Sequence, residues 1–470
     1  MTFAKNVPIN ITGPSYQSRS KPLSSQQTKN FYHDIVEEGK DNYVMQSFPG
    51  LKFKSTAGSG DRGMVRSKEI GYRVSGEKLY SFNSFGVHTE LADIPGTDRA
   101  VLSTDGTNII IVTSAAVYQW NGSISTVTDT NIVGSKAVTF LNSQMIYTND
   151  SLFTVADPNN PDSASGLNSA SAESQPDDLV MCYAFQQSAY MIGKHSAEPW
   201  WNTGIGNPPL ERIDGQIFEV GCSALHSIAN TDEFLYWLGD DAAVYQVTGG
   251  SKNRVSSTAI SHAIAGYSKI DDAIGQTFTL EGINFYLLTF PTENKTWCLN
   301  EELGKNGWFE ISSGIEGKKW QGSSVLSVYN KLFVADSDSG NLYELDLDTL
   351  TNNSEILQRR RVTSSINGKL LGSPGSRIQM SRFEVLMETG QTVIDGQGDK
   401  AQIQFEVSYD GGNSWVSKGW GTVGRLGQFM LRVEMFNMDS FYDCIVRLTT
   451  SDPAKYTLYS AAADLRLAGR

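Results

Sequence analysis

The chain has 470 residues, of which 39% are hydrophobic, so it can form two or three domains with sizeable cores. Its 44 Gly, 19 Tyr and 21 Phe residues favour many short strands and tight turns over long helices. The formal net charge of -13 argues against a sequence-independent nucleic-acid clamp, which would need an excess of Lys and Arg.

The cysteines and the N-terminus bear on the cellular compartment. Four cysteines are widely separated and form no CxxC pair: Cys182, Cys222, Cys298 and Cys444. We therefore expect buried thiols made in a reducing cytoplasm, and no zinc site. The first residues lack the apolar core of a signal peptide, and no run approaches the ~18 to 20 apolar residues of a membrane span. These features predict a soluble protein made in the cytoplasm, with no membrane span.

Residues 1–45 are polar and contain Pro8, Pro14 and Pro22, which favour an extended backbone. Aromatic pairs within this stretch, such as Phe31-Tyr32, are unusual for a free tail. We expect an extended N-terminal arm that lies along a surface of the protein.

A four-residue pattern recurs over the next 300 or so residues. It consists of an aliphatic residue, an aromatic residue, a polar or small residue and a large apolar residue, as in Leu79-Tyr80-Ser81-Phe82. Further copies start 35 to 52 residues apart and occupy residues 117–120, 152–155, 198–201, 244–247, 296–299 and 342–345. This is the period of propeller blades, each a four-stranded sheet. The pattern predicts a β-propeller of six or seven blades over residues 46–355.

Three segments interrupt the repeat. Long loops are expected at 157–178 and 203–221, and loops of this length usually contact a partner or carry function. Residues 255–274 have apolar side chains at roughly helical spacing and are the best helix candidate.

Strictly alternating apolar and polar residues follow, as in Ala401-Gln402-Ile403-Gln404-Phe405. Such alternation indicates half-buried antiparallel strands. We expect a C-terminal β-sandwich over residues 356–470. The predicted fold is therefore all-β: a propeller of six or seven blades, then a β-sandwich, with an extended N-terminal arm.

One hairpin in the predicted sandwich resembles the Asp-box turn of sialidases. It runs from Ser408 to Trp415, with Asp410, Gly412 and Trp415 at the characteristic positions. In such a turn the Asp caps backbone N–H groups and the Trp packs beneath, so the device is structural. A sialidase would need several such boxes and an arginine cluster for the substrate carboxylate.

A basic run, Arg359-Arg360-Arg361, lies at the junction of the two predicted domains. It could be a solvated or salt-bridged linker. It could also dock an acidic partner or DNA phosphates.

No pattern in the sequence requires catalysis. The five histidines never pair at metal-ligand spacing, and no GxSxG, HExxH or Walker sequence is present. We predict no catalytic residues, no metal and no cofactor, and hence no enzyme.

Three stretches together resemble the tail hub of short-tailed Salmonella-type lambdoid phages, also called the packaged-DNA-stabilising or tail accessory protein. They are Ser47-Phe48-Pro49-Gly50, the run from Tyr72 to Tyr80, and Ala172-Glu173-Ser174-Gln175-Pro176-Asp177. Order, spacing and chain length agree with that family, although the C-terminal third resembles it only in strand pattern.

The resemblance implies a non-enzymatic virion protein, made in the host bacterial cytoplasm and located in the tail. Six copies would form a ring below the portal-adaptor ring, extend the DNA channel and close the DNA-filled head. The ring would offer sites for a tail needle or plug and for tailspikes or tail fibres. DNA would pass the lumen without sequence recognition. Within the third stretch, Glu173, Gln175, Pro176 and Asp177 could contact a partner or close a blade.

A glycan-binding or glycan-cleaving, sialidase-like propeller is the alternative. The Asp-box-like hairpin and the abundant Trp and Tyr favour it. It predicts tryptophans clustered at one mouth of the propeller.

Overall fold

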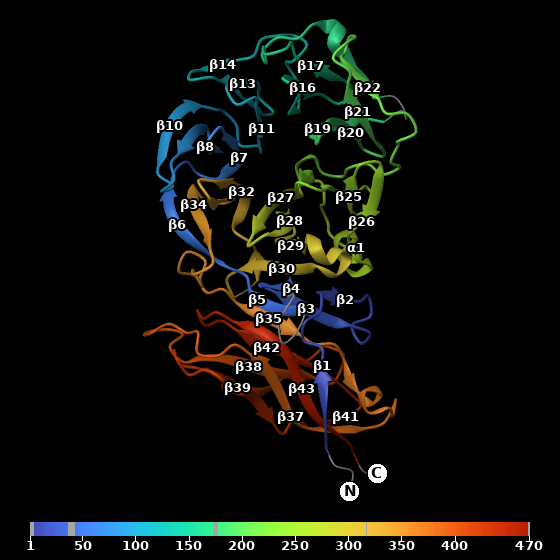
Figure 1. Ribbon diagram of the computed structural model, residues 1–470, viewed down its shortest axis with the longest axis vertical. Helices are drawn as coiled ribbons and strands as arrows, with labels where there is room; N and C mark the ends of the chain where they lie inside the picture. The colour runs from blue at the N-terminus through green and yellow to red at the C-terminus, as the bar shows by residue number, and fades with distance from the viewer. Residues whose placement is uncertain (1–3, 36–42, 173–176, 316, 469–470) are drawn as a thin grey trace.

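The computed structural model describes residues 4–35, 43–172, 177–315 and 317–468. Its regular structure is almost entirely β, and the blades of a propeller occupy the upper part of Figure 1 above a two-sheet C-terminal region. Six separate four-stranded sheets and four strands of a 12-stranded sheet make up seven blades. The predicted all-β propeller followed by a sandwich is confirmed, with seven blades.

Blades are numbered here in chain order, and the strands of each are given from the axis outward. Blade 1 contains β7 (Asp61–Ser67), β8 (Ile70–Ser75), β9 (Lys78–Phe82) and β10 (His88–Asp93). Blade 2 contains β11 (Val101–Thr104), β12 (Ile109–Val112), β13 (Val117–Trp120) and β14 (Ile124–Thr126). Blade 3 contains β15 (Ala137–Leu141), β16 (Gln144–Thr148), β17 (Phe153–Val155) and β18 (Ser169–Ala170). Blade 4 contains β19 (Leu179–Phe185), β20 (Ser188–Gly193), β21 (Ala197–Asn202) and β22 (Leu210–Arg212).

The last three blades follow the same order. Blade 5 contains β23 (Ala229–Asn230), β24 (Leu235–Leu238), β25 (Val244–Thr248) and β26 (Ser251–Arg254). Blade 6 contains β27 (Ile274–Leu280), β28 (Ile283–Phe290), β29 (Lys295–Asn300) and β30 (Trp308–Ser313), with the short β31 (Lys318–Lys319) beside β30. Blade 7 contains β32 (Gly322–Val328), β33 (Lys331–Asp336), β34 (Asn341–Asp346) and β6 (Gly50–Thr56).

The recurring four-residue pattern corresponds to the third strand of every blade. In β9, for example, Leu79, Tyr80 and Phe82 are buried while Ser81 is half-buried. The looser copies at 198–201 and 296–299 are β21 and β29, so each of the seven copies marks one blade. The pattern is visible in the sequence because each third strand packs both faces against neighbouring blades.

Blade 7 is closed by an N-terminal strand. β6 pairs antiparallel with β34, with Tyr343 opposite Phe53 and Leu345 opposite Leu51. The inner strands then follow one another around the axis, and β32 of the last blade packs against β7 of the first. The seam between blades 7 and 1 thus joins strands about 260 residues apart in the chain.

Two sheets form the C-terminal sandwich. One contains β37 (Ile378–Met387), β40 (Val433–Phe436), β41 (Ser440–Phe441) and β43 (Thr457–Leu467). The other contains β35 (Arg359–Val362), β36 (Ile366–Asn367), β38 (Ala401–Ser408), β39 (Val416–Gly424) and β42 (Asp443–Thr450). Buried side chains such as Phe383, Phe405 and Val446 fill the space between the sheets.

The N-terminal residues are extended, but they are built into these sheets and do not simply lie on a surface. In the first sheet are β1 (Lys5–Ile9), β4 (Phe31–Ile35) and β5 (Tyr43–Ser47); in the second are β2 (Tyr16–Gln17) and β3 (Ser25–Lys29). β3 also meets β30, so blade 6 and the second sandwich sheet form one continuous sheet. We therefore propose that the sandwich unit comprises residues 4–35 and 43–47 together with 356–468.

The remaining elements are short. α1 (Thr258–Ala265) lies within the predicted helical segment and starts at Ser257, whose hydroxyl accepts a hydrogen bond from the Ile260 N–H. The 3-10 turns are η1 (Gly166–Asn168), η2 (Leu225–Ser227), η3 (Glu301–Asn306) and η4 (Gly368–Leu371). All four cysteines are buried free thiols. Within the described ranges, no helix has the length and apolarity to cross a bilayer.

Candidate functional site at the propeller axis and seam

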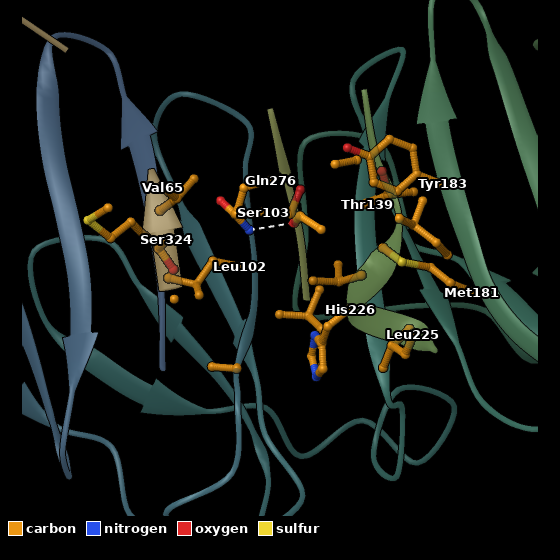
Figure 2. Close-up of a pocket in the computed structure, with 18 of the residues that line it drawn as sticks. Val65, Leu102, Ser103, Thr139, Met181, Tyr183, Leu225, His226, Gln276 and Ser324 are labelled. Atoms are coloured by element: carbon orange, nitrogen blue, oxygen red, sulfur yellow. Dashed lines mark hydrogen bonds between the residues drawn. The ribbon is translucent and has the colours of Figure 1, made fainter. Parts of the chain in front are cut away.

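The inner strands of all seven blades line a cavity of about 530 Å³ at the propeller axis (Figure 2). A second cavity, of about 720 Å³, lies beside blades 2 and 3. Arg99, Leu225 and His226 line both cavities and so lie between them.

Most polar groups along the axis are already used to join blades. Hydrogen bonds cross the boundaries 1/2, 3/4, 4/5, 5/6 and 6/7 as follows: Ser67 Oγ with Thr104 Oγ1 at 3.0 Å, Ala184 N to Thr139 Oγ1 at 3.0 Å, Tyr183 Oη to Asn230 Oδ1 at 2.8 Å, Thr277 Oγ1 to Asn230 O at 2.6 Å and Val325 N to Gln276 Oε1 at 3.2 Å. Since a side chain so bonded has little capacity left for a ligand, the axis is suited to holding the ring rigid.

Ionisable groups are few at the axis. Among the described residues that line the axial cavity there is no Asp or Glu, and hence no pair of carboxylates for acid–base chemistry. Burial and the charge of Arg99 lower the pKa of His226 to about 3, so its imidazole is neutral at pH 7.

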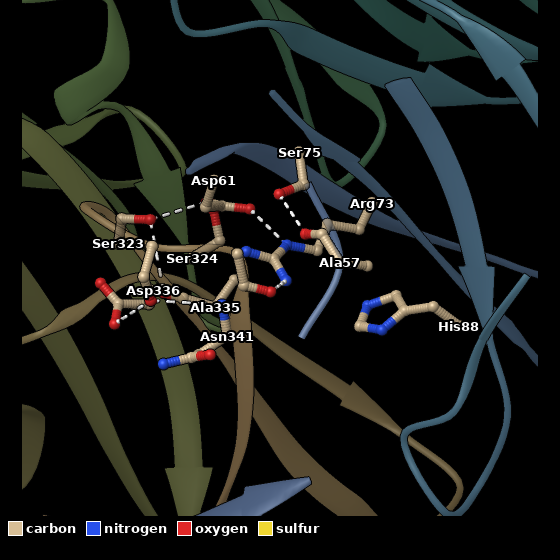
Figure 3. Close-up of polar contacts among 12 residues, drawn as sticks. Ala57, Asp61, Arg73, Ser75, His88, Ser323, Ser324, Ala335, Asp336 and Asn341 are labelled. Atoms are coloured by element: carbon tan, nitrogen blue, oxygen red, sulfur yellow. Dashed lines mark hydrogen bonds and ion pairs between the residues drawn. The ribbon is translucent and has the colours of Figure 1, made fainter. Parts of the chain in front are cut away.

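The most strongly built polar cluster lies just off the axis, at the seam between blades 7 and 1 (Figure 3). Arg73 of β8 and Asp61 of β7 form a fully buried ion pair, with Nε and Oδ1 3.3 Å apart. Asp61 also accepts hydrogen bonds from the hydroxyls of Ser323 and Ser324 of β32, at 2.7 and 2.5 Å. Arg99, ahead of blade 2, approaches the same carboxylate at 3.8 Å.

Arg73 extends this cluster to the turn before β34. Its Nη1 donates to Gly340 O at 3.0 Å, and burial of Arg99 lowers the pKa of that second guanidinium. The single carboxylate of Asp61 thus faces two cations, Arg73 of blade 1 and Arg99 ahead of blade 2. The cost of removing both charges from water offsets most of the attraction between them, so a buried ion pair of this kind adds little net stability. Its main effect is to fix how the strands that carry it are arranged.

The stretches that carry the family resemblance have structural roles here. Phe48 is fully buried among aromatic rings that include Phe278 and Trp320. Gly50 passes so close to the carbonyl oxygens of Thr349 and Thr351 that a side chain could not fit. The second stretch, from Tyr72 to Tyr80, supplies Arg73 to the seam.

In the third stretch Asp177 caps a turn of blade 4. Its Oδ2 accepts from the backbone N–H groups of His195 and Ser196, at 2.6 and 2.9 Å. Glu173, Gln175 and Pro176 lie outside the described residues.

The basic run is only partly exposed. Arg359 and Arg361 are 1% and 0% exposed, on the inward side of β35, whereas Arg360 on the other side is half-buried. Arg361 donates to carbonyl oxygens of Ile11 at 2.6 Å and Pro14 at 3.3 Å. The prediction that all three arginines form a docking patch is therefore wrong for Arg359 and Arg361, because alternation along β35 turns both side chains inward. Arg360 remains a candidate contact.

Burial of these two guanidinium groups alters their ionisation. It lowers the pKa of Arg361 to about 9 and that of Arg359 to about 10. Arg361 also bonds the Thr28 hydroxyl at 2.9 Å and Gln26 Oε1 at 3.0 Å, and no carboxylate is among its hydrogen-bond partners. It ties the N-terminal strands to the sandwich.

The Asp-box-like hairpin joins β38 to β39. Asp410 accepts hydrogen bonds from the Ser414 hydroxyl at 2.6 Å, from the backbone N–H groups of Ser414 at 2.9 Å and Asn413 at 3.0 Å, and from the Ser408 hydroxyl at 2.7 Å. These bonds, with that of the Ser414 hydroxyl foremost, hold the pKa of Asp410 well below the usual range. Gly412 adopts a φ of 93°, which favours glycine. The Arg447 guanidinium stacks on the Trp415 ring, 4.1 Å from its centroid.

Tryptophans do not gather at a propeller mouth. Trp237, Trp308 and Trp320 are fully buried, and the exposed pair, Trp201 and Trp420, lies on blade 4 and on the sandwich respectively. The arrangement predicted by the glycan-binding alternative is absent from the described residues.

The long loop at 203–221 borders an exposed apolar surface. Trp201, Ile205 and Ile217 are 47%, 78% and 42% exposed there, and Glu211 lies opposite Trp201 in the blade 4 sheet. Trp201 and Ile205 lie at or beyond the end of β21, whereas Ile217 precedes Phe218, which pairs with Ala197 at the start of that strand. Exposed apolar side chains are candidates for interaction surfaces, and Trp201 and Ile205 are the two at this end of the strand.

Asp61, Arg99, Ser323 and Ser324 were not singled out from the sequence. Asp61 and the two serines lie on strands about 260 residues apart, and such residues have no local signature. The one available signal was Arg73, a charged residue within a predicted strand, where it is buried beside the buried Val74.

Comparisons with known proteins agree with the architecture. A family model described as "Bacteriophage P22 Gp10, beta-propeller" matches residues 5–350. No curated protein matches the sequence. Among solved structures, the streptogramin B lyase is 11% identical with a TM-score of 0.43, over 64% of this chain and 98% of that one. The N-terminal domain of Nup159 is 11% identical with a TM-score of 0.42, over 68% of this chain and 99% of that one.

The two structural likenesses are too distant to carry an argument about function. The family match covers most of the chain, including β1 through β34, and its description names the propeller that the strands form. This chain belongs to the phage-stabilisation family of bacteriophage P22 Gp10.

Proposed function

We propose that this phage structural tail protein is the subunit of a six-membered tail hub. The ring docks below the portal-adaptor ring, extends the DNA channel, helps to close the DNA-filled head, and offers attachment sites for a tail needle and for tailspikes or fibres. The family match over residues 5–350 carries the proposal. The family is one of structural phage proteins, which accords with the expectation that the chain is not an enzyme and is located in the virion.

The construction of the chain supports a mechanical role. The seam and the blade-to-blade hydrogen bonds hold the propeller together, and the sheet shared by blade 6 and the sandwich couples the two regions. A rigid subunit transmits load without opening, as a part that holds back packaged DNA must do. The polar groups of the axis are engaged within the chain, so DNA would pass through the lumen of the ring and not through the propeller itself.

Charge is distributed unevenly along the chain. Residues 1–355 contain 24 Lys and Arg against 40 Asp and Glu, whereas residues 356–470 contain 14 against 11. A lumen lined by acidic propeller surface would repel DNA phosphates and let the genome slide. Charge reversal of lumen-facing acidic residues should then slow DNA ejection. If ejection and DNA retention were unchanged, the proposal of an acidic lumen that lets the genome slide would be refuted.

We further propose that the exposed surface by the 203–221 loop contacts another subunit or a tail partner. A ring of identical copies requires heterologous interfaces, in which two different surfaces meet. The double substitution W201S and I205S should weaken ring formation. The matched control V87S, at an exposed valine of blade 1, should not.

Closure of the head is testable with particles that lack this protein. DNA-filled heads bearing portal and adaptor should leak DNA, measured as nuclease-sensitive genome, and purified protein should stop the leak. Equal leakage with and without the protein would contradict the proposal. Cleavage of host polysaccharide by the isolated protein would favour the glycan-active alternative.

A further inference from the structure

The loop that joins β39 to β40 carries a dense group of exposed apolar side chains. Between 37% and 88% of each is exposed, and the residues are Leu426, Phe429, Met430 and Leu431. Within the described ranges, no other six consecutive residues contain as many exposed large apolar side chains. Folding of the chain gives no reason to place such a group in water, so its exposure points to a partner outside the chain.

The backbone of this loop is held in place although its apolar side chains are exposed. Gln428 closes a turn twice, because its N–H donates to Arg425 O at 2.9 Å and its side-chain oxygen accepts from the Arg425 N–H at 2.8 Å. The Gly427 N–H donates to Gly390 O at 3.2 Å, so the loop also rests on the segment that follows β37. A loop fixed in this way can present its side chains to a partner at little further cost in conformational entropy.

Positive charge lies on both sides of the apolar residues. Arg425 precedes them and Arg432 follows them, and both arginines are exposed. Arg432 reaches the carboxylates of Glu384 and Glu434 only at 3.7 and 3.9 Å. The sandwich unit contains 17 Lys and Arg against 12 Asp and Glu, whereas residues 48–355 contain 19 against 36. A negatively charged partner would therefore be attracted to the sandwich and repelled by the propeller.

Two classes of partner match an apolar loop with flanking cations: an acidic protein surface and a bilayer that contains anionic lipid. A stable protein interface takes about 20–30 residues from each side. Residues 425–432 are only eight. A bilayer needs no complementary shape, because apolar side chains enter the boundary between headgroups and acyl chains while cations stay at the phosphates. β39 also lies at the end of the molecule away from blades 2 to 4, so a flat surface can meet this end without meeting the acidic blades (Figure 1).

We propose that the loop at residues 425–432 docks this protein on the surface of an anionic phospholipid bilayer. Leu426, Phe429 and Met430 enter the interface, and Arg425 and Arg432 bind lipid phosphates. The contact is peripheral, and it weakens as salt is added because the charges are screened. The inference does not rest on the proposed function, since a tail hub can assemble without this contact.

Flotation of the full chain with vesicles tests the proposal. The native protein should float with vesicles of phosphatidylglycerol and phosphatidylcholine, and not with phosphatidylcholine alone. F429S/M430S should bind about tenfold more weakly or worse, because the apolar area that enters the bilayer is lost. The matched control F85S removes an exposed phenylalanine of blade 1 and should bind as the native protein does. No flotation of the native protein, or an equal loss in F85S, would overturn the proposal.

A label at the tip of the loop gives a second readout. All four native cysteines are buried, so M430C offers an exposed thiol to a polarity-sensitive dye. Its emission should shift to the blue with anionic vesicles, whereas the same dye at F85C should not respond. Unchanged emission at M430C would contradict insertion. If the native protein ignored vesicles and F429S/M430S failed to join portal-adaptor rings, the loop would be a protein contact and the lipid proposal would be wrong.

Discussion

Two buried arginines, Arg73 and Arg361, hold the chain together in different ways. Arg73 at the propeller seam is paired with the carboxylate of Asp61, whereas Arg361 at the sandwich is surrounded mainly by carbonyl oxygens. Each charge helps to lower the pKa of a histidine: that of the half-buried His88 at the seam and that of the buried His33 at the sandwich. The difference shows that a buried cation can be accommodated by one full counter-charge or by several dipoles.

The largest expected effect follows from removing the counter-charge. In D61A, Arg73 and Arg99 would both be left buried without their carboxylate, so we expect a loss of about 3–5 kcal/mol of unfolding free energy. Denaturant unfolding measures it. The control D338A removes an exposed carboxylate that pairs with Lys319, and should cost less than about 1 kcal/mol. Similar losses in the two variants would contradict the role given to the seam.

The histidines make both regions sensitive to acid. Burial, and secondarily the charge of Arg361, lowers the pKa of His33 to about 4, below the ordinary value of 6.5. As the pH falls, the unfolded chain therefore binds this proton before the folded chain does. The contribution of neutral His33 to the free energy of unfolding is fully present above about pH 6.5 and is lost as the pH falls towards 4. The loss is about 3 kcal/mol for a shift of this size.

Unfolding free energies at pH 7 and pH 4 test this directly, with H33Q as the comparison. The difference between the two pH values should be smaller in H33Q than in the native protein. An equal difference in both would show that His33 does not titrate as described.

Removing the sandwich arginine should have a smaller effect than removing Asp61, because no opposite charge is left behind. R361M would leave the carbonyl oxygens of Ile11 and Pro14 short of a donor, at a cost of about 2 kcal/mol. The N-terminal strands should become more sensitive to protease. R360M changes a half-buried neighbour on the same strand and should leave the unfolding free energy and the protease sensitivity nearly unchanged. If R360M had the same effects as R361M, the distinction between the two faces of β35 would fail.

The smallest effect is expected at the hairpin that Asp410 caps. Unlike Asp61, this carboxylate has no charged partner among its hydrogen bonds and is bonded near the surface to two backbone N–H groups and two serine hydroxyls. D410A should lose about 1 kcal/mol, the usual value for a lost cap. A loss as large as that of D61A would mean that the hairpin supports much more of the sandwich than its contacts indicate.

The sequence revealed the propeller because its signal is local and repeated. Leu79 and Tyr80 fall on both packed faces of one strand, and the same grouping returns once per blade. The N-terminal strands of the sandwich could not be found in this way, since Val7 pairs with Ala463 and nothing near Val7 specifies that partner.

Charge was the less reliable guide to sites. Arg359-Arg360-Arg361 reads as an exposed basic run until it is placed on a strand, where alternate residues face opposite sides. Asp61 could not be chosen among 51 acidic residues, because its partners come together only when the last blade meets the first.

The hub itself is tested most directly by electron microscopy of this protein mixed with portal-adaptor rings. Six-fold density should appear below the adaptor, with the propeller of each subunit fitting as a rigid body and a lumen wide enough for duplex DNA. Rings that remain bare, or added density of another symmetry, would contradict the assignment of this chain as the tail hub.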